Sequence, residues 1–356
     1  MDADPAFAAA DLASTAAETA ETADTVITVD TTAGTAADPT FADVLAARDL
    51  LAARLPPTPM WSYPALDAAT GAHVYVKHEN TQPVGAFKVR GGLTLLAGLS
   101  PAERARGLVT YSTGNHAQSI AYACAAFDAS CTVVMPAEAN PAKVRAVRAL
   151  GAEVLLHGAD MAGAQSRAEE YALAGGGLLI SPGDTAALVA GVGTTYLEIL
   201  TARPDLDAVL VPVGSGTGAA GALLVAAELA PNCRVFAVQS AASPAAHDSW
   251  RTGSCVTRAN TTVVEGLATG RGFELPQRLL RTTGLADFLL VTDAQIAHAQ
   301  RLLATHAHTL AEGAGAAALA AVLAHPTEFK GLDIAVVCTG GNASLAEITS
   351  LGRDHT

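Results

Sequence analysis

The chain alternates short runs of β-branched and aliphatic residues with longer Ala-rich stretches, and this alternation limits the folds that it can adopt. The predicted strands are residues 73–78, 108–112, 131–136, 152–157, 208–213, 234–239 and 334–339. The predicted helices between them are residues 115–127, 140–150, 219–230 and 292–307. Strands that are apolar on both faces and alternate with helices are typical of parallel sheets covered on both sides. We therefore expect an α/β protein with open, mostly parallel sheets flanked by helices.

Charge and composition exclude several classes of protein. The net charge is −13, which argues against nucleic acid or an anionic membrane surface as a partner, because both require clustered Lys and Arg. No apolar run reaches the roughly 18 residues that a membrane span needs, and the N-terminal "MDADPAF" lacks the basic start of a secretory signal. The five cysteines are odd in number and form no C-x-x-C pair, which favours reduced core thiols in a cytoplasmic protein.

Residues 1–40 differ from the rest of the chain. They are rich in Ala, Thr and Asp, lack Lys and Arg, and show no sustained apolar period. Such a segment cannot bury enough apolar surface to offset the entropy lost on ordering. We expect a disordered acidic tail over 1–40 and a folded protein from residue 41 onward.

A glycine-rich loop, "GSGTGAAG" at 214–221, follows one predicted strand and opens a helix. Ligands of such folds bind beyond the C-terminal ends of the strands, and glycines there let backbone N–H groups approach an anion. The pattern G-x-G-x-x-G begins at Gly216. A dinucleotide would require an acidic residue about 20 positions on, where the chain has Gln239 and Ser240. We expect a phosphate site that does not belong to a nicotinamide cofactor.

Two further loops follow predicted strands. "STGNHAQS" at 112–119 offers hydroxyl and amide donors next to a helix that begins near Asn115, which suits a carboxylate ligand or an ordinary helix cap. His116 taken alone is more typical of a packed histidine than of a catalyst. "TGGNAS" at 339–344 places a hydroxyl at a strand end, and Ser344 is suited to capping the next helix.

The stretch "VGAFKVRGG" at 84–92 places Lys88 between apolar neighbours at a strand-to-helix junction. A surface lysine is the ordinary alternative. An amine in an apolar pocket would have its pKa lowered and would react with aldehydes. The amine, the phosphate loop, the carboxylate loop and the polar strand end together suit an aldehyde-bearing phosphate cofactor, pyridoxal phosphate, with an amino acid as the small-molecule substrate.

Several motifs in order strengthen this prediction: residues 79–92, 112–119, 211–221, 265–270, 312–321 and 338–344. They resemble the pyridoxal-phosphate enzymes of the tryptophan-synthase-β fold type (fold type II), specifically the threonine/serine dehydratase and serine racemase group. The resemblance covers roughly residues 50–350. It implies a two-lobed homodimeric enzyme with a small domain at 107–184. The large, cofactor-binding domain would comprise 41–106 and 185–356.

The resemblance also implies roles for individual residues. Lys88 would bind the cofactor covalently and act as the general base, with Phe87 packed beside the ring. Asn115 would hydrogen-bond the ring hydroxyl, and Thr339 would contact the pyridine nitrogen. The phosphate would be held by Gly214, Ser215, Gly216, Thr217 and Gly218.

On the substrate side, the resemblance implies that Gly266 and Thr269 line the side-chain pocket. The α-carboxylate would be bound by Ser112, Thr113, Gly114, Asn115 and His116. Thr113 falls where serine racemase has a proton-donating hydroxyl, so it suits either that role or a hydrogen bond to the carboxylate. Gln239 and Ala245 stand where some relatives have acidic metal ligands, and we therefore expect no metal site.

The implied reaction is β-elimination of a β-hydroxy amino acid of the L-threonine or L-serine type to a 2-keto acid and ammonia. A racemase or β-replacement enzyme on the same scaffold is the alternative, and a ligand-binding protein without catalysis is a third class. Arg271 is suited to pairing with a second carboxylate, as in 3-hydroxyaspartate, or to lying in solvent as a loop arginine. The sequence leaves these alternatives open.

Overall fold

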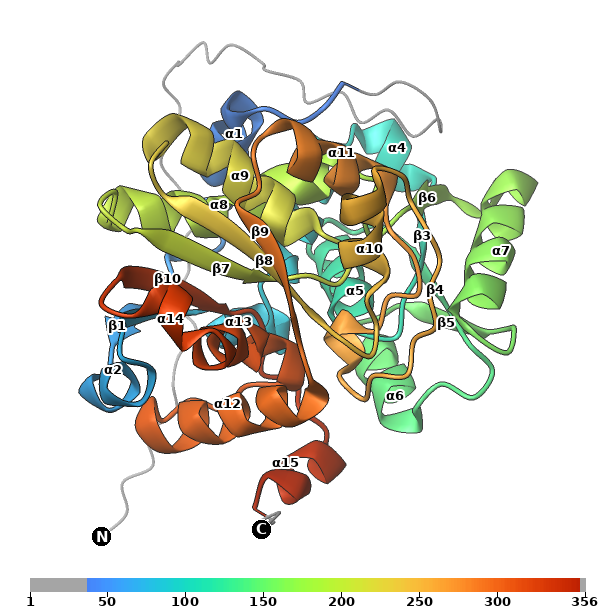
Figure 1. The fold of residues 1–356 in the computed structure, drawn as a ribbon. Coiled ribbons are helices and arrows are strands. Elements are labelled where there is room, and N and C mark those ends of the chain that lie inside the picture. The colour runs from blue at the N-terminus through green and yellow to red at the C-terminus, as the bar shows by residue number, and fades with distance from the viewer. Residues whose placement is uncertain (1–36, 353–356) are drawn as a thin grey trace, which may run out of the picture.

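A computed structural model describes residues 37–352 of the protein, in which strands form two separate sheets (Figure 1). The larger sheet has the strand order β1-β2-β10-β7-β8-β9, and the smaller has the order β5-β4-β3-β6. All neighbouring strands run parallel except β1 and β2. The predicted α/β architecture with two open, mostly parallel sheets is confirmed. The predicted disordered tail lies outside the described residues, apart from 37–40.

The strands of the larger sheet are β1 (Met60–Ser62), β2 (His73–His78), β7 (Ala208–Pro212), β8 (Arg234–Ser240), β9 (Asp287–Val291) and β10 (Asp333–Cys338). Those of the smaller sheet are β3 (Leu108–Tyr111), β4 (Cys131–Met135), β5 (Glu153–Leu156) and β6 (Leu178–Ile180). Every strand predicted from the sequence is present within one or two residues at each end. The prediction missed β1, β6 and β9.

The first helices are α1 (Phe41–Leu51), α2 (Pro64–Thr70), α3 (Lys88–Gly98), α4 (Pro101–Ala105), α5 (Asn115–Ala126), α6 (Pro141–Ala149), α7 (Met161–Tyr171) and α8 (Ala186–Ala202). The later ones are α9 (Thr217–Leu229), α10 (Ala245–Thr252), α11 (Glu274–Thr282), α12 (Asp293–His306), α13 (Gly313–Ala324), α14 (Pro326–Phe329) and α15 (Leu345–Leu351). Short 3-10 turns occupy Glu79–Thr81, Pro83–Gly85 and Glu265–Leu267, and a π turn covers Ala172–Gly176. The four predicted helices correspond to α5, α6, α9 and α12.

Both faces of the larger sheet are buried, because successive side chains of a strand point to opposite sides. Leu210 of β7 packs with α12 and α13 on one face, whereas Val209 and Val211 pack with α8 and α9 on the other. Figure 1 shows these two pairs of helices below and above the sheet. The strands therefore have continuous apolar runs, which made them recognisable in the sequence.

Small residues allow the helices of the larger lobe to approach closely. A Cβ atom at Gly221 of α9 would lie 2.8 Å from the Cα of Gly193 in α8, so the two backbones are in contact there. The third glycine of the G-x-G-x-x-G pattern thus serves helix packing, whereas Gly216 is the N-cap of α9 and Gly218 lies in its first turn. This packing fixes where α9 begins, and with it the position of the glycine-rich loop.

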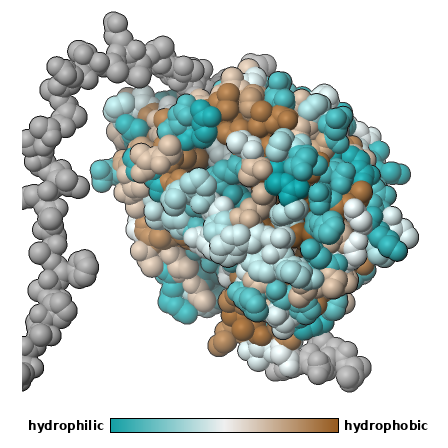
Figure 2. Space-filling model, turned by 90° about the vertical axis from the view of Figure 1, so that its left-hand side faces the viewer, coloured by the Kyte–Doolittle hydropathy of each residue, from teal (hydrophilic) through white to brown (hydrophobic). Residues whose placement is uncertain are grey.

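The smaller sheet is covered by α5 and α6 on one side and α7 on the other, on the right in Figure 1. Helix α3, which carries Lys88 at its first position, packs on α5, so it joins the two lobes. The surface in Figure 2 mixes polar and apolar residues, with apolar patches near its upper and lower ends. Within residues 37–352, no helix has the length and hydropathy needed to cross a membrane.

Candidate active site

The amine of Lys88 lies at the glycine-rich loop. Its Nζ atom is 2.7 Å from the hydroxyl of Thr217 and 3.1 Å from that of Ser215. The two motifs are more than 120 residues apart in the chain, and the fold brings them into direct contact. Phe87 lies alongside, because a Cβ atom at Gly218 would be 3.2 Å from its ring. The structure thus groups the amine, the ring wall and the phosphate loop predicted from the sequence.

Burial lowers the pKa of Lys88 to about 8, from an ordinary value of 10.5. Its hydrogen bonds to Ser215 and Thr217 go to neutral hydroxyls, which do little to stabilise the ammonium form. A minor fraction of the side chain is therefore a neutral amine at pH 7, and this fraction rises to about half near pH 8. A neutral amine is the form that attacks aldehydes and removes protons.

The backbone of the glycine-rich loop has features that suit binding of an anion. Gly216 has φ of 96°, a conformation that favours glycine, and it precedes α9 without a side-chain cap. The N–H groups of the first turn of α9 have no intrahelical partners and face the loop. A Cβ atom at Gly214 would collide with the carbonyl of Gly266, and the Thr269 hydroxyl donates to the Gly214 carbonyl at 3.1 Å. The phosphate loop and the predicted side-chain pocket are therefore adjacent.

The loop at 112–119 leads into α5, and Gly114 occupies the N-cap position without a side-chain hydrogen bond. The Ser112 hydroxyl instead accepts from the Gly114 N–H at 3.1 Å. The first turn of α5 therefore has no side-chain cap, and its N–H groups suit a carboxylate ligand. Thr113 is partly exposed in this loop.

His116 points away from this loop. Its Nε2 atom lies 2.8 Å from the hydroxyl of Thr110, and the side chain is buried. Burial, with a smaller contribution from Lys88, lowers the pKa of His116 to about 3, so the imidazole is neutral. Its side chain is the packed histidine that its sequence context suggested, and its backbone N–H, in the first turn of α5, is the group that suits the predicted substrate contact.

The strand end at Thr339 is tied to the turn that carries Lys88. The Thr339 carbonyl accepts from the Phe87 N–H at 2.9 Å, and Ala86 pairs with Gly340 as an isolated bridge. These contacts place the predicted ring-nitrogen partner beside the predicted cofactor lysine.

Two residues that the sequence interpretation gave no role contact Asn115. The Asn115 amide nitrogen donates to Glu312 at 2.6 Å, and the amide nitrogen of Asn342 donates to the Asn115 carbonyl oxygen at 2.8 Å. Burial raises the pKa of Glu312 to about 7. Both residues lie inside motifs quoted above, which was the available signal, but the motifs do not say which side chains meet.

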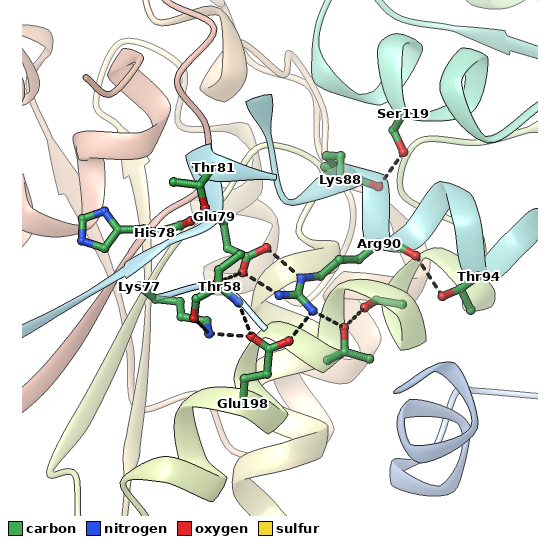
Figure 3. A network of polar contacts seen from close by, with 12 residues as sticks. Thr58, Lys77, His78, Glu79, Thr81, Lys88, Arg90, Thr94, Ser119 and Glu198 are labelled. Carbon is green, nitrogen blue, oxygen red and sulfur yellow. Dashed lines mark hydrogen bonds and ion pairs between the residues drawn. The ribbon is translucent and has the colours of Figure 1, made fainter. Parts of the chain in front are cut away.

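A buried network of charges supports the helix that begins at Lys88 (Figure 3). The Arg90 guanidinium makes two 2.8 Å hydrogen bonds to Glu79 and one of 2.7 Å to Glu198. Glu198 also pairs with Lys77 at 2.5 Å. Arg90 and Glu79 are almost fully buried. The network ties α3 to the end of β2 and to α8, and so fixes the direction in which Lys88 leaves the helix.

The remaining predicted positions lie at the edge of the site. Gln239 uses its amide within the protein, since its nitrogen lies 3.4 Å from the Thr269 hydroxyl and its oxygen accepts from the His247 N–H at 3.1 Å. The described part of the chain contains no group of three or more His, Cys, Asp or Glu side chains that could hold a metal. Arg271 is partly exposed and lies 3.8 Å from Asp184.

These residues fit a pyridoxal phosphate group. A partly neutral amine projects into a loop whose hydroxyls and helix N-terminus suit a phosphate, and the glycines at 214, 216 and 218 let this loop pack closely against its neighbours. Asn115 at the start of α5 and Thr339 after β10 offer polar groups, and Phe87 supplies an apolar wall. The donor set thus provides a partner for each polar part of the cofactor.

Comparisons with known proteins agree with a pyridoxal phosphate site. The family model described as "Pyridoxal-phosphate dependent enzyme" matches residues 51–340. The chain is 32% identical to the L-threo-3-hydroxyaspartate ammonia-lyase of Saccharomyces cerevisiae, covering 88% of this chain and 96% of that protein. It is 36% identical to the L-threonine ammonia-lyase of Thermotoga maritima, covering 78% and 69%. The structure of the serine racemase from Dictyostelium discoideum superposes with a TM-score of 0.81 at 29% identity, covering 87% of this chain and all of that one. The chain therefore belongs to the family of pyridoxal-phosphate-dependent enzymes.

Proposed function

We propose that this protein is an ammonia-lyase that converts a β-hydroxy amino acid of the L-threonine or L-serine type to a 2-keto acid and ammonia. The observation that carries the proposal is the contact of the Lys88 amine with Ser215 and Thr217 of the glycine-rich loop. It combines a nucleophilic amine with a phosphate site, as the family's cofactor requires. The names of the Saccharomyces and Thermotoga relatives support the reaction type.

Different residues of the site have different roles in the proposed reaction. When bound, the cofactor supplies an electron-withdrawing ring that acidifies the substrate's Cα–H bond. We assign phosphate binding to the loop at 214–218, ring contacts to Phe87, Asn115 and Thr339, and removal of the Cα proton to the neutral amine of Lys88. A hydroxyl at Thr339 cannot fully protonate the ring nitrogen, which suits loss of a β-hydroxyl better than reactions that need a stronger electron sink.

The loop at 112–116 orients the substrate. Its backbone N–H groups at the start of α5 bind the α-carboxylate, and Gly266 and Thr269 line the space for the side chain. Holding the carboxylate and the amine at two fixed points directs the Cα–H bond at Lys88, and such positioning contributes strongly to rate. Thr113 either adds a hydrogen bond to the carboxylate or donates a proton on the face opposite Lys88.

Assays with L-serine, L-threonine and 3-hydroxyaspartate test the proposed reaction. We expect release of 2-keto acid and ammonia from at least one of them by the purified protein with pyridoxal phosphate. Conversion of an L-amino acid to its D form without keto acid would instead support the racemase alternative. Product formation only when a second nucleophile is added would support β-replacement.

A second candidate is a dehydratase for a dicarboxylic substrate such as 3-hydroxyaspartate. Arg271 favours it, because this partly exposed guanidinium lies two residues beyond Thr269 and acts electrostatically on Tyr111, which precedes Ser112. Its one salt bridge within residues 37–352, to Asp184, is long at 3.8 Å, so a substrate carboxylate could compete for it. The Saccharomyces relative carries this activity in its name.

In the same assays, Arg271→Gln separates the two substrates. If Arg271 binds a second carboxylate, the variant loses about 10- to 100-fold in kcat/KM on 3-hydroxyaspartate, the usual cost of a lost charge-assisted hydrogen bond. Its kcat/KM on threonine stays within about twofold. Arg258→Gln, at an exposed arginine that pairs with Asp248, is the matched control. Equal losses on both substrates would remove Arg271 from substrate selection.

The lowered pKa of Lys88 predicts how capture of the cofactor depends on pH. The rate at which the cofactor-free protein takes up pyridoxal phosphate should rise with pH, with a midpoint near 8, and level off above it. Between pH 8 and the ordinary value of 10.5 the unfolded chain binds more protons at Lys88, so the folded protein gains stability as pH rises through this window. Stopped-flow absorbance measures the rate, and a midpoint near 10.5 would contradict the prediction.

We further propose that the protein works in the cytoplasm as a homodimer. Its five cysteines are all free and four are buried, which suits a reducing compartment. The homodimer rests on the family resemblance.

We also propose a small domain at 107–184, with 41–106 and 185–356 forming the large domain. The smaller sheet supports this division, because its strands lie between Leu108 and Ile180.

A further inference from the structure

A chain of three side chains runs along the rim of the site, from the turn before Lys88 to the start of α13. The Asn342 amide nitrogen donates to the Val84 carbonyl at 2.7 Å and to the Asn115 carbonyl oxygen at 2.8 Å. The Asn115 amide nitrogen in turn donates to Glu312 at 2.6 Å. We call Asn342, Asn115 and Glu312 the amide relay.

The backbone carbonyl of Val84 fixes the direction of every hydrogen bond in the amide relay. The Val84 carbonyl can only accept, so the Asn342 nitrogen must face it. That nitrogen also faces Asn115, which must therefore present its oxygen to Asn342 and its nitrogen to Glu312. Asn side chains are ambiguous between two orientations when taken alone, but here the Val84 carbonyl selects one orientation for both asparagines.

Two glycines make room for the amide relay. A Cβ atom at Gly85 would lie 2.7 Å from the Asn342 side-chain oxygen, and a Cβ atom at Gly340 would collide with the carboxyl group of Glu312. Gly340 would also crowd the Asn115 amide nitrogen, at 3.1 Å. Both glycines flank the bridge between Ala86 and Gly340 that holds the Lys88 turn. The packing around the relay is therefore specific to these side chains.

The Asn115 nitrogen carries two hydrogens, and Glu312 takes one of them. The second remains for a ligand. We propose that Asn342 and Glu312 are positioning residues that hold Asn115 as a hydrogen-bond donor toward the ring hydroxyl of the cofactor. The inference rests on the role proposed above for Asn115. It adds that Asn115 donates the hydrogen bond to the ring hydroxyl and does not accept one from it. If the amide were reversed, Asn115 would offer the ring hydroxyl only an acceptor.

Asn342→Asp tests the amide relay with almost no change in shape. A carboxylate at this position cannot donate to either the Val84 carbonyl or the Asn115 oxygen, so it favours the reversed orientation of Asn115. We expect pyridoxal phosphate to bind about 10- to 100-fold more weakly to the cofactor-free protein, as measured by titration of its visible absorbance. The pH midpoint of that absorbance should move upward, because a ring oxygen that loses a donor holds the neighbouring proton more tightly.

Two further variants make the test specific. Asn342→Ala removes the donors without adding charge, and it should also weaken cofactor binding and raise the midpoint if the first variant does not fold. Asn232→Asp makes the same chemical change at an exposed asparagine in the turn before β8, and it should leave both quantities unchanged. A purely structural role for Asn342 would lower the thermal midpoint of the cofactor-free protein without moving the pH midpoint of the absorbance.

The outcomes separate this inference from the proposed function. A wild-type protein that binds no pyridoxal phosphate would contradict the proposed function itself. Wild-type protein that binds it, together with position-342 variants of equal affinity and equal pH midpoint, would overturn the amide relay alone. Weaker binding with a raised midpoint in both Asn342 variants, and not in Asn232→Asp, would support it.

Discussion

Replacement of Lys88 by alanine is expected to abolish turnover, lowering kcat by about 10³-fold or more. The variant loses both the amine that would attach the cofactor and the base that would remove the substrate's Cα proton. Its contacts with Ser215 and Thr217 show that the amine reaches the phosphate loop, and its pKa of about 8 shows that part of it is neutral at working pH. Keto-acid release and the visible absorbance of the bound cofactor measure the two losses.

The matched control is Lys330→Ala, which removes an exposed lysine far from the loop and should leave both readouts unchanged. Lys88→Arg keeps the positive charge but offers no neutral amine, so it should fail like the alanine variant. The cofactor-free Lys88→Ala protein should fold as well as the wild type, since it loses a desolvated amine. Retention of both absorbance and turnover in this variant would rule out Lys88 as the attachment site.

The sequence predicted the strands that are buried on both faces, because these need uninterrupted apolar runs. Strands β7 and β10, whose residues alternate between the two cores, are the clearest cases. It missed β1 and β6, which are only three residues long, and such segments carry no measurable period. Strand β1 joins the sheet only by pairing antiparallel with β2, and a partner of this kind is set by the tertiary fold rather than by local composition.

The site was predictable where chemistry is concentrated in a short motif. Lys88, the loop at 214–218 and the loop at 112–116 each carry a residue pattern that suits one part of the cofactor or substrate. Lys88 and the loop at 214–218 meet because both follow strands of the larger sheet, β2 and β7, and the C-terminal ends of parallel strands share one edge of a sheet. The loop at 112–116 follows β3 of the smaller sheet, so this rule does not predict its position. The structure brings Lys88 and the glycine-rich loop within hydrogen-bonding distance, as the motifs required.

The supporting side chains were not predictable, because their partners are distant in the chain. Asn342 contacts Asn115 across 227 positions, and Arg90 contacts Glu198 across 108. A single sequence shows that an asparagine or arginine is present, but not which acceptor the fold brings to it. The direction of the amide relay depends on one backbone carbonyl, at Val84, whose placement only the folded turn determines.

The buried charges beneath α3 give the second large expected effect. Arg90→Met should destabilise the protein by about 3–5 kcal/mol, the cost of leaving one member of a buried pair without its partner. Glu79 is fully buried and would keep only the hydroxyl of Thr58, which donates to it at 2.6 Å. Since Lys88 lies two residues before Arg90 on the same helix, the variant should also lose cofactor affinity. Denaturant unfolding of the cofactor-free protein measures the first effect.

The reason for this loss of stability can be tested by removing the buried Glu79 carboxylate, which is left without its partner. In Arg90→Met combined with Glu79→Gln, no carboxylate is buried alone, so much of the lost stability should return. Arg234→Met is the surface control, because its pair with Glu328 is more than 40% exposed on both sides and should contribute less than about 1 kcal/mol. If Arg90→Met were no more destabilising than Arg234→Met, the network would not hold α3 in place. The direction of Lys88 would then depend on the Ala86–Gly340 bridge and on the packing of α3 against α5.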